Sequence, residues 1–265
     1  MYNQPLLAGT LLDERYRIEA VLGEGGFGVT YAAENVRLGM KVAVKELFWR
    51  GHSSRDAAVS PEVVLEAKDR AVFEEQKARF LREARAIRDF SNLPGVVHIL
   101  DYFEANATAY IVMEYVQGET LASHLASRGR IPAEEVFRRF LPLIETLGRI
   151  HAGGVIHRDI SPDNIMVQPD GSLKLIDFGA VRFFSGAEEG KYTAIAKDSY
   201  APGEQYDKNG RQGPWTDVYA LCATIYTCVA GVAPLSAVQR LFLDELQSPS
   251  QLGVEIAAPY EAVIM

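Results

Sequence analysis

The stretch Ile156-His-Arg-Asp-Ile-Ser-Pro-Asp-Asn164 is the most informative part of this 265-residue sequence. It places Asp159 and Asn164 five residues apart in a polar loop. A carboxylate in such a loop could accept the proton of an incoming hydroxyl, while a carboxamide oxygen could bind a metal ion. Thirteen residues after Asn164, Asp177-Phe-Gly179 puts a second carboxylate at the end of a predicted strand. Hard Mg²⁺ prefers oxygen ligands, so Asn164 and Asp177 are the candidate metal ligands.

A glycine-rich loop, Gly23-Glu-Gly-Gly-Phe-Gly28, precedes this stretch and separates two predicted strands. Glycine lets the backbone approach a phosphate, whose oxygens can then accept hydrogen bonds from the amides. The loop alone also fits a tight hairpin. A dinucleotide-binding fold would need a helix directly after the last glycine, whereas Val29-Thr-Tyr31 reads as a strand.

Lys45 ends an apolar strand, and Glu83 lies on a predicted amphipathic helix. A single lysine at a strand end is most simply an exposed residue. A lysine held by a carboxylate is instead a positioned cation for the phosphates of a nucleotide. We therefore expect Lys45 and Glu83 to act together.

The hydrophobic pattern divides the chain into a strand-rich part and a helical part. The predicted strands of the first part are 16–22, 29–34, 41–47, 96–102 and 109–116, and its helix is 61–90. The second part has helices at 120–127 and 133–151, strands at 165–168 and 173–176, and a helix of about 14 residues from Asp217 to Gly231.

Composition limits the partners and the compartment. A formal net charge of −8 argues against nucleic acid or an anionic membrane as the main partner. The N-terminus lacks the pattern of a secretory signal, and the uncharged run Val218–Gln239 is too interrupted for a membrane span, so we expect no membrane segment. Cys222 and Cys228 do not suit a disulfide, which favours a cytoplasmic location.

In this order and spacing, the motifs closely resemble the signature set of protein kinases. The resemblance extends from Tyr16 to the last residue and implies an α+β, bilobal fold. Residues 1–116 would form an N-lobe with a small antiparallel five-stranded sheet and one main helix, and 117–265 a mainly helical C-lobe. It also implies ATP, Mg²⁺ with Mn²⁺ as an alternative, and transfer of the γ-phosphoryl group to Ser or Thr hydroxyls of a protein substrate.

The resemblance assigns roles to individual residues. Asp159 would be the catalytic base, with Lys45, Glu83, Asn164 and Asp177 completing the catalytic set. Asp217 would brace the catalytic loop, a role that is compatible with a position as a simple helix N-cap. The nucleotide would be bound by Gly23, Gly25, Gly26, Phe27, Gly28, Thr30, Ala43, Lys45, Met113, Glu114, Val116 and Met166, with Met113 as gatekeeper and 114–116 as hinge.

Several positions depart from the usual pattern. Ser161 stands where serine/threonine kinases usually carry a lysine that helps to neutralise the transferring phosphate. Pro202-Gly-Glu204 replaces the usual Ala-Pro-Glu, and together with the glycine loop it resembles one bacterial branch of serine/threonine kinases. The family normally continues beyond the last residue here, so we expect a C-lobe truncated at its C-terminus.

The segment between Asp177 and Glu204 resembles an activation segment. We expect autophosphorylation there, mainly at Thr193, and a homodimer that phosphorylates in trans. Two alternatives stay open at this point. A small-molecule kinase of related fold shares the spacing of Asp159 and Asn164, and a pseudokinase could act as a nucleotide-dependent scaffold.

Overall fold

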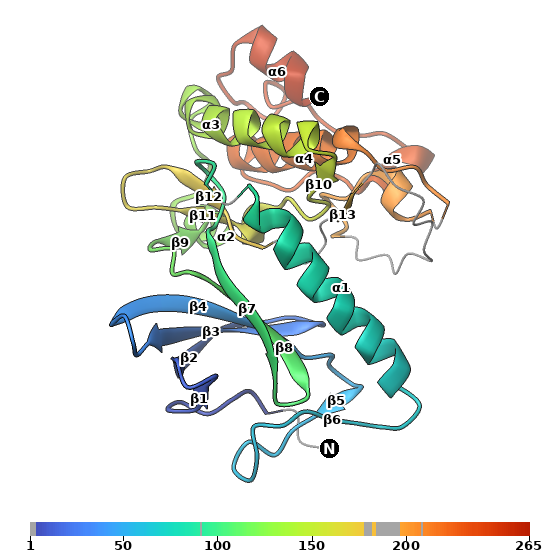
Figure 1. The fold of residues 1–265 in the computed structure, drawn as a ribbon. Coiled ribbons are helices and arrows are strands. Elements are labelled where there is room, and N and C mark those ends of the chain that lie inside the picture. The colour runs from blue at the N-terminus through green and yellow to red at the C-terminus, as the bar shows by residue number, and fades with distance from the viewer. Residues whose placement is uncertain (1–3, 91, 178–181, 184–196, 208) are drawn as a thin grey trace. The chain divides into compact units, whose positions relative to one another are not determined.

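The computed structural model describes residues 4–90, 92–177, 182–183, 197–207 and 209–265. It divides the chain into two compact units (Figure 1). The first contains residues 1–92 and 97–116, and the second contains 93–96 and 117–265. One boundary thus falls between Val116 and Gln117, while the short stretch 93–96 belongs with the second unit.

A six-stranded antiparallel sheet organises the first unit, with strand order β1-β2-β3-β4-β8-β7. Four of the five long strands lie close to where the hydrophobic pattern predicted them, and β7 begins and ends three residues later than the predicted strand 96–102. The prediction of five strands is nevertheless wrong by one, because β1 has only two residues and shows no periodicity of its own. The strands are β1 Leu11–Leu12, β2 Tyr16–Glu24, β3 Gly28–Asn35, β4 Met40–Leu47, β7 Ile99–Ala105 and β8 Thr108–Glu114.

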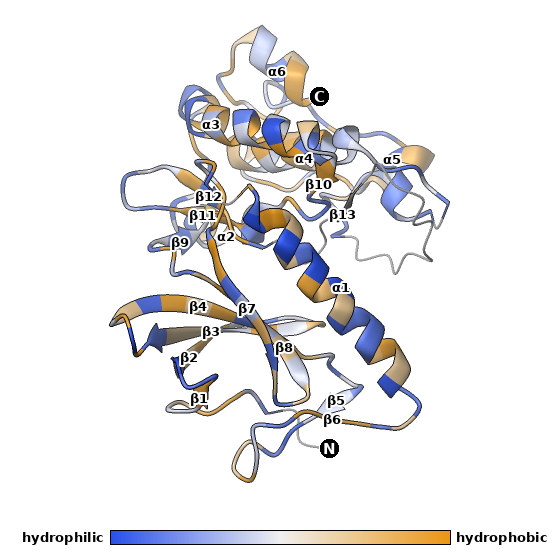
Figure 2. Ribbon diagram, viewed as in Figure 1, coloured by the Kyte–Doolittle hydropathy of each residue, from blue (hydrophilic) through white to orange (hydrophobic). Residues whose placement is uncertain are grey.

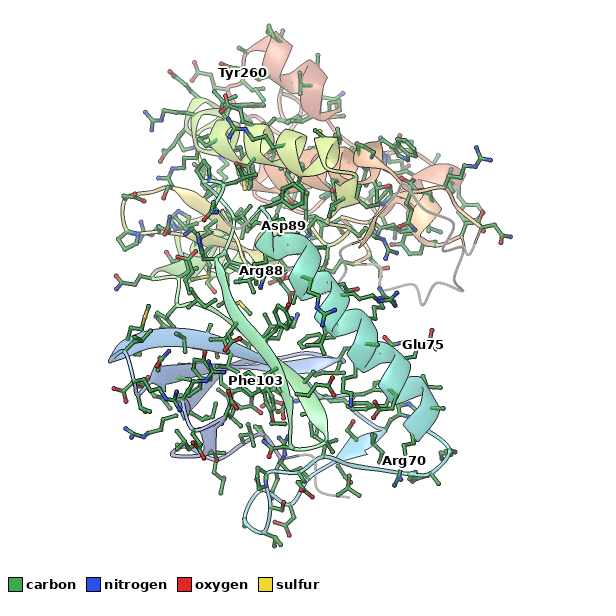
Figure 3. The ribbon with its side chains drawn as sticks, viewed as in Figure 1. Arg70, Glu75, Arg88, Asp89, Phe103 and Tyr260 are labelled. Carbon is green, nitrogen blue, oxygen red and sulfur yellow. The ribbon has the colours of Figure 1, made fainter. Side chains whose placement is uncertain are left out.

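The helix of this unit, α1, spans Arg70–Arg88 and therefore begins nine residues later than predicted. Figure 3 shows Arg70 and Arg88 at its two ends. The preceding residues instead form β6 Val64–Leu65, which pairs with β5 Ser53–Ser54. Hydrophilic and hydrophobic residues alternate along α1 (Figure 2), and one face of the helix carries its buried apolar residues. Those buried apolar residues are Phe73, Phe80, Leu81, Ala84, Ala86 and Ile87.

A fully buried ion pair fastens the β5–β6 segment to the sheet. The side chains of Arg55 and Glu46 are both 0% exposed, and Arg55 Nη1 donates to Glu46 Oε2 at 3.1 Å. The hydroxyls of Tyr31 and Tyr110 also donate to the Glu46 carboxylate, at 2.7 and 2.9 Å. Arg55 Nε donates to the carbonyl of Pro61 at 2.8 Å. Because Glu46 follows Lys45 in β4, this network fixes the strand that carries the predicted phosphate clamp.

The second unit is mainly helical. Its helices are α2 Leu121–Arg128, α3 Ala133–Ala152, α4 Pro214–Ala230, α5 Ala237–Phe242 and α6 Ala258–Ile264. Its short strands are β9 Glu119–Thr120, β10 Val155–Ile156, β11 Ile165–Val167, β12 Leu173–Leu175 and β13 Arg182–Phe183. Single 3₁₀ turns lie at Pro162–Asn164 and Gly203–Gln205. Tyr260 of α6 (Figure 3) stacks on Phe137 of α3, with ring centroids 4.2 Å apart.

Helix α4 is longer than predicted and begins three residues before Asp217. Pro214 occupies its first turn, where a missing N–H costs nothing, and Thr216 Oγ1 accepts a hydrogen bond from Gly213 N at 3.2 Å. Gly231 ends the helix in the left-handed conformation with φ of 78°, as predicted. Within the described part of the chain, no helix has both the length and the apolar character that crossing a membrane requires.

We predict that Arg55→Met lowers the free energy of unfolding of the first unit by about 3–5 kcal/mol, because the Glu46 carboxylate would stay buried without its cation. Urea unfolding followed by the fluorescence of Trp49 measures this loss. Arg17→Met is the matched control, because its ion pair with Glu34 is exposed and should contribute about 0–1 kcal/mol. Equal losses in the two variants would contradict the prediction.

Candidate active site

One buried carboxylate holds the predicted catalytic loop in place. Asp217 in α4 is 0% exposed and accepts hydrogen bonds from the backbone amides of His157 at 2.8 Å and Arg158 at 2.7 Å. His151 Nε2 lies 2.7 Å from the same carboxylate. The expected brace is therefore confirmed. The interpretation as an N-cap is wrong, because Asp217 lies inside the helix.

Within the loop, Asn164 fixes the position of the candidate base. Its Nδ2 donates to the Asp159 carboxylate at 2.7 Å and to the Asp159 backbone carbonyl at 2.8 Å. Both amide hydrogens are used in this way, so the carboxamide oxygen of Asn164 faces away from Asp159 and can accept from, or coordinate, another group. One asparagine thus orients the carboxylate and presents an oxygen ligand.

Asp177 reaches the same place from strand β12. Strands β11 and β12 pair in antiparallel register, with Ile165 opposite Leu175. Directly after β12, the amide of Ile176 donates to the carbonyl of Asn164 at 3.0 Å, which places Asp177 next to the loop. Asp159, Asn164 and Asp177 thus lie close together on the second unit, and their roles as base and metal ligands stay predictions. Phe178 and Gly179, which complete the motif, lie outside the described residues.

The electrostatics of the loop separate the roles of Asp159 and His157. Burial raises the pKa of Asp159 and the nearby charge of Asp177 raises it further, whereas Lys197 and His157 lower it. Burial lowers the pKa of His157, which is fully buried. Its Nδ1 accepts the backbone amide of Asp159 at 3.2 Å. A neutral, buried imidazole used in this way supports the loop, and the carboxylate is the group suited to take a proton.

An oxygen-ligated cation fits the residues present. Asn164 offers a carboxamide oxygen and Asp177 a carboxylate, and Mg²⁺ commonly takes one or two such ligands from a protein while phosphates and waters fill its other positions. Both donors lie on the second unit, at the end of β12 and the beginning of β11. The donor chemistry is thus that of a hard divalent ion.

The glycine loop joins β2 and β3 of the first unit. Gly25 N donates to Gly28 O at 2.8 Å, which closes the loop on itself. A Cβ at position 28 would lie 2.7 Å from the carbonyl oxygen of Glu46, so packing against β4 requires glycine there. At Gly23 and Gly26 a Cβ would meet nothing within 4 Å. These two glycines are not required by the protein's own packing, which suits a loop that is accessible to a ligand. Phe27, between them and Gly28, stacks on Trp49 at 6.4 Å.

The predicted nucleotide contacts of the first unit share one face of its sheet. Thr30 lies opposite Lys45 in the β3–β4 pair, and Ala43 lies opposite Met113 in the β4–β8 pair. Residues two apart in a strand face the same way, so these four side chains form a neighbouring group. Their strands place them in this group irrespective of side-chain rotamers.

The remaining predicted residues lie on separate elements. In the hinge, Glu114 accepts from His98 N at 2.8 Å, and Val116 is half-buried at the end of the first unit. Glu83 is buried on α1 and accepts from Arg79 Nε at 2.8 Å. Met166 belongs to the second unit, on β11.

Three residues that support the site were not predicted. Gln205, only 3% exposed, donates to the carbonyl of Arg158 at 2.9 Å. Arg158 itself has a left-handed φ of 71°, which a non-glycine residue adopts only when its surroundings hold it there. The other two residues that were not predicted are His151 and Lys197. The Glu-Gln-Tyr variant at 204–206 was the one available signal for Gln205, and no local pattern marks the other two.

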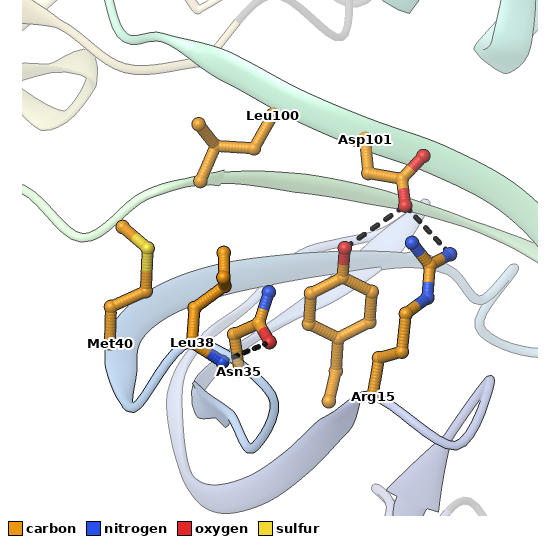
Figure 4. Close-up of a pocket in the computed structure, with 7 residues that line it drawn as sticks. Arg15, Asn35, Leu38, Met40, Leu100 and Asp101 are labelled. Carbon is orange, nitrogen blue, oxygen red and sulfur yellow. Dashed lines mark hydrogen bonds and ion pairs between the residues drawn. The ribbon is translucent and has the colours of Figure 1, made fainter.

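A surface pocket of about 400 Å³ on the first unit lies apart from these residues (Figure 4). The carboxylate of Asp101 accepts from Tyr16 OH at 2.9 Å and pairs with Arg15 at 2.8 Å. None of the residues that line this pocket belongs to the predicted site. They are Arg15, Tyr16, Asn35, Leu38, Met40, Leu100 and Asp101.

We predict that Asp217→Ala accelerates hydrogen exchange at the amides of His157 and Arg158 by about 10²-fold or more, because each hydrogen bond to a charged group contributes about 1.5–3 kcal/mol. Exchange followed by mass spectrometry or NMR measures the change. Asp170→Ala is the control, because that exposed carboxylate contacts only Ser172 in a turn among the bonds described. Unchanged protection at residues 157 and 158 in Asp217→Ala would refute the bracing role.

Comparison with known proteins agrees with this geometry. A family model described as the protein kinase domain matches residues 16–258. Serine/threonine-protein kinase PknA of Nostoc sp. is 34% identical over 234 residues, which cover 84% of this chain and 38% of that protein. Serine/threonine-protein kinase PknL of Mycobacterium bovis is 31% identical over 246 residues, covering 90% of this chain and 56% of the relative. The chain therefore spans only part of the length of both relatives.

A solved structure titled "PpkA-294 apo form" has a TM-score of 0.82 and 31% sequence identity to this chain, and the match covers 98% of this chain and 91% of that one. The predicted α+β kinase fold is thereby confirmed. Because the family model matches nearly the whole length and the relatives exceed 30% identity, this chain belongs to the family of protein kinase domains.

Proposed function

We propose that the chain is the catalytic domain of a serine/threonine protein kinase, which transfers the γ-phosphoryl group of ATP to hydroxyl groups of proteins. The observation that carries this proposal is the arrangement of the braced loop. Asp159 is held by Asn164 beside Asp177, so a candidate base and two oxygen ligands lie together. The printed names of the bacterial relatives support serine and threonine as the acceptors.

The chemistry assigns one task to each of these groups. Asp159 accepts the proton of the acceptor hydroxyl while that oxygen forms a bond to the γ-phosphorus and the bond to the β-γ bridging oxygen breaks, releasing ADP. Asn164 and Asp177 would hold Mg²⁺, with Mn²⁺ as an alternative, and the cation supplies charge neutralisation on the phosphates. The short bonds from Asn164 keep the Asp159 carboxylate in one orientation, which reduces the cost of aligning it.

The first unit would bind the nucleotide. The glycine loop would offer backbone amides to the phosphates, and Lys45, which we expect Glu83 on α1 to support, would offer a cation. Thr30, Ala43 and Met113 share the sheet face described above and would contact the adenine ring. Glu114 and Val116 would hydrogen-bond the base through their backbone. Met166, on β11 of the second unit, stays a predicted nucleotide contact.

Regulation and location follow from the same proposal. Thr193, which we propose as the main autophosphorylation site, lies outside the described residues. Transfer from one copy to the activation segment of another would use a homodimer, and a phosphorylation rate that rises with protein concentration would support it. A kinase that consumes ATP on proteins also fits the cytoplasmic location expected from the cysteine content.

We predict that Asp159→Asn and Lys45→Ala each lower phosphate transfer by about 10²-fold or more, because both groups act in the same transition state. Radiolabelled ATP with Mg²⁺ and a generic basic protein measures the transfer, and Lys68→Ala, an exposed lysine paired with Glu66, is the control. Transfer to small alcohols or aminoglycosides instead would identify a small-molecule kinase. No transfer by the unaltered protein, with nucleotide binding intact, would identify a scaffold.

We also predict that activity is lost on acidification at a pH above the ordinary aspartate value of about 4. Burial raises the pKa of Asp159, so the protonated form, which cannot accept a proton, persists to higher pH than it would in an exposed aspartate. Activity therefore rises as pH increases through the raised pKa. A profile of kcat between pH 4 and 8 tests this, and a profile that is flat down to pH 4 would contradict it.

A further inference from the structure

A lysine from outside the catalytic loop lies against it. Lys197 precedes Tyr200 at the beginning of a described segment, 36 residues after Ser161 in the sequence. Its Nζ donates to Ser161 Oγ at 2.9 Å and lies 3.0 Å from Asp163 Oδ2. All three residues belong to the second unit, so their mutual placement does not depend on the first.

We propose that Lys197 is a catalytic residue, which contacts the γ-phosphoryl group and neutralises its charge during transfer. This inference rests on the proposed kinase function and deepens it. It also accounts for Ser161, whose hydroxyl cannot carry a charge itself but can hold the ammonium group of Lys197 in place.

The geometry supports this assignment in two ways. Ser161 is fully buried, so its hydroxyl is a fixed acceptor, whereas the side chain of Lys197 is 36% exposed and keeps its ammonium group accessible. An ammonium group has three donors, and the two contacts described leave one available for a phosphate oxygen. The residue is anchored without being enclosed, as a ligand-binding cation needs to be.

Lys197 also lies close to the candidate base. Its hydrogen-bond partner Ser161 is two residues after Asp159, in the same loop, whose Asn164 side chain bonds Asp159. The acceptor oxygen must lie between Asp159 and the γ-phosphorus when the proton is removed. A cation held on this loop is therefore close to the path of the transferring group, where negative charge needs stabilisation.

A purely structural role for Lys197 explains less. Its ion pair with Asp163 is largely exposed, because the Asp163 side chain is 61% exposed, and pairs of this kind contribute about 0–1 kcal/mol. A residue that only anchored the segment could be replaced by a neutral hydrogen-bond donor of similar length. A residue that neutralises phosphate could be replaced only by another cation.

Substitution of Lys197 distinguishes these roles. Lys197→Gln keeps hydrogen bonding to Ser161 and Asp163 but removes the charge, and Lys197→Arg keeps the charge. We expect Lys197→Gln to lower kcat by about 10²-fold, with the KM for ATP nearly unchanged, and Lys197→Arg to recover at least about tenfold. The same pattern should appear in ATP hydrolysis without a protein acceptor, which does not depend on substrate docking.

A relocated cation provides a second test. The double variant Ser161→Lys with Lys197→Gln returns a charge to the catalytic loop and should recover at least about tenfold in kcat over Lys197→Gln alone. Lys68→Gln is the matched control and should retain full activity, because that lysine is 72% exposed and pairs only with Glu66 among the ion pairs described. Thermal unfolding of each variant verifies that it is folded. Full activity in Lys197→Gln, or equal loss in Lys197→Gln and Lys197→Arg, would overturn the proposal.

Binding measurements separate this inference from the kinase proposal. ADP with aluminium fluoride and Mg²⁺ mimics the transferring phosphoryl group, and calorimetry can compare its affinity with that of ADP and Mg²⁺ alone. We expect Lys197→Gln to weaken binding of the mimic by about tenfold and to leave ADP binding unchanged. That result would uphold the role of Lys197 even if no protein acceptor were phosphorylated. Equal weakening of both ligands, no weakening of either, or no binding of the mimic by the unaltered protein would overturn it.

Discussion

The catalytic loop depends on the buried carboxylate of Asp217. A carboxylate with no solvent exposure is costly unless its oxygens accept several hydrogen bonds, and here two backbone amides and the ring of His151 approach it. The same bonds constrain the loop at His157 and Arg158, immediately before Asp159. The left-handed backbone of Arg158 is held from its other side by Gln205. A rigid helix, α4, thus determines where the candidate base lies.

From this anchor the chemistry of the second unit follows in short steps. Asp159 is oriented by Asn164, and Asn164 is bonded through its carbonyl to the residue before Asp177. Burial lowers the pKa of His157 and raises the pKa of Asp159, so the candidate base of the loop is the carboxylate rather than the imidazole. Lys197 lies outside the catalytic loop in the sequence, but its ammonium group supplies positive charge near this candidate base.

In the first unit, strand β4 is held in place next to the glycine loop. Glu46 and Arg55 do this from the interior, because a buried ion pair with two tyrosine hydroxyls tolerates little displacement. The close approach of Gly28 to the Glu46 carbonyl ties the loop to the same strand. Lys45 therefore lies on a strand that both the Glu46 network and the contact with Gly28 hold in place.

Local patterns in the sequence predict the class of fold, the order of the elements and the identity of the chemical groups. A period of two marks the strands β3 and β4, and a spacing of three to four marks the helices α1 and α3. These signals can be read from the sequence because they depend on residues that are close together in the chain. Only the folded chain shows the late beginning of α1, the pairing of β5 with β6, and the contacts of Asp217 with His151, of Gln205 with Arg158 and of Lys197 with Ser161. Those contacts join residues 36 to 66 positions apart, where no local periodicity records which partner a buried polar group will find.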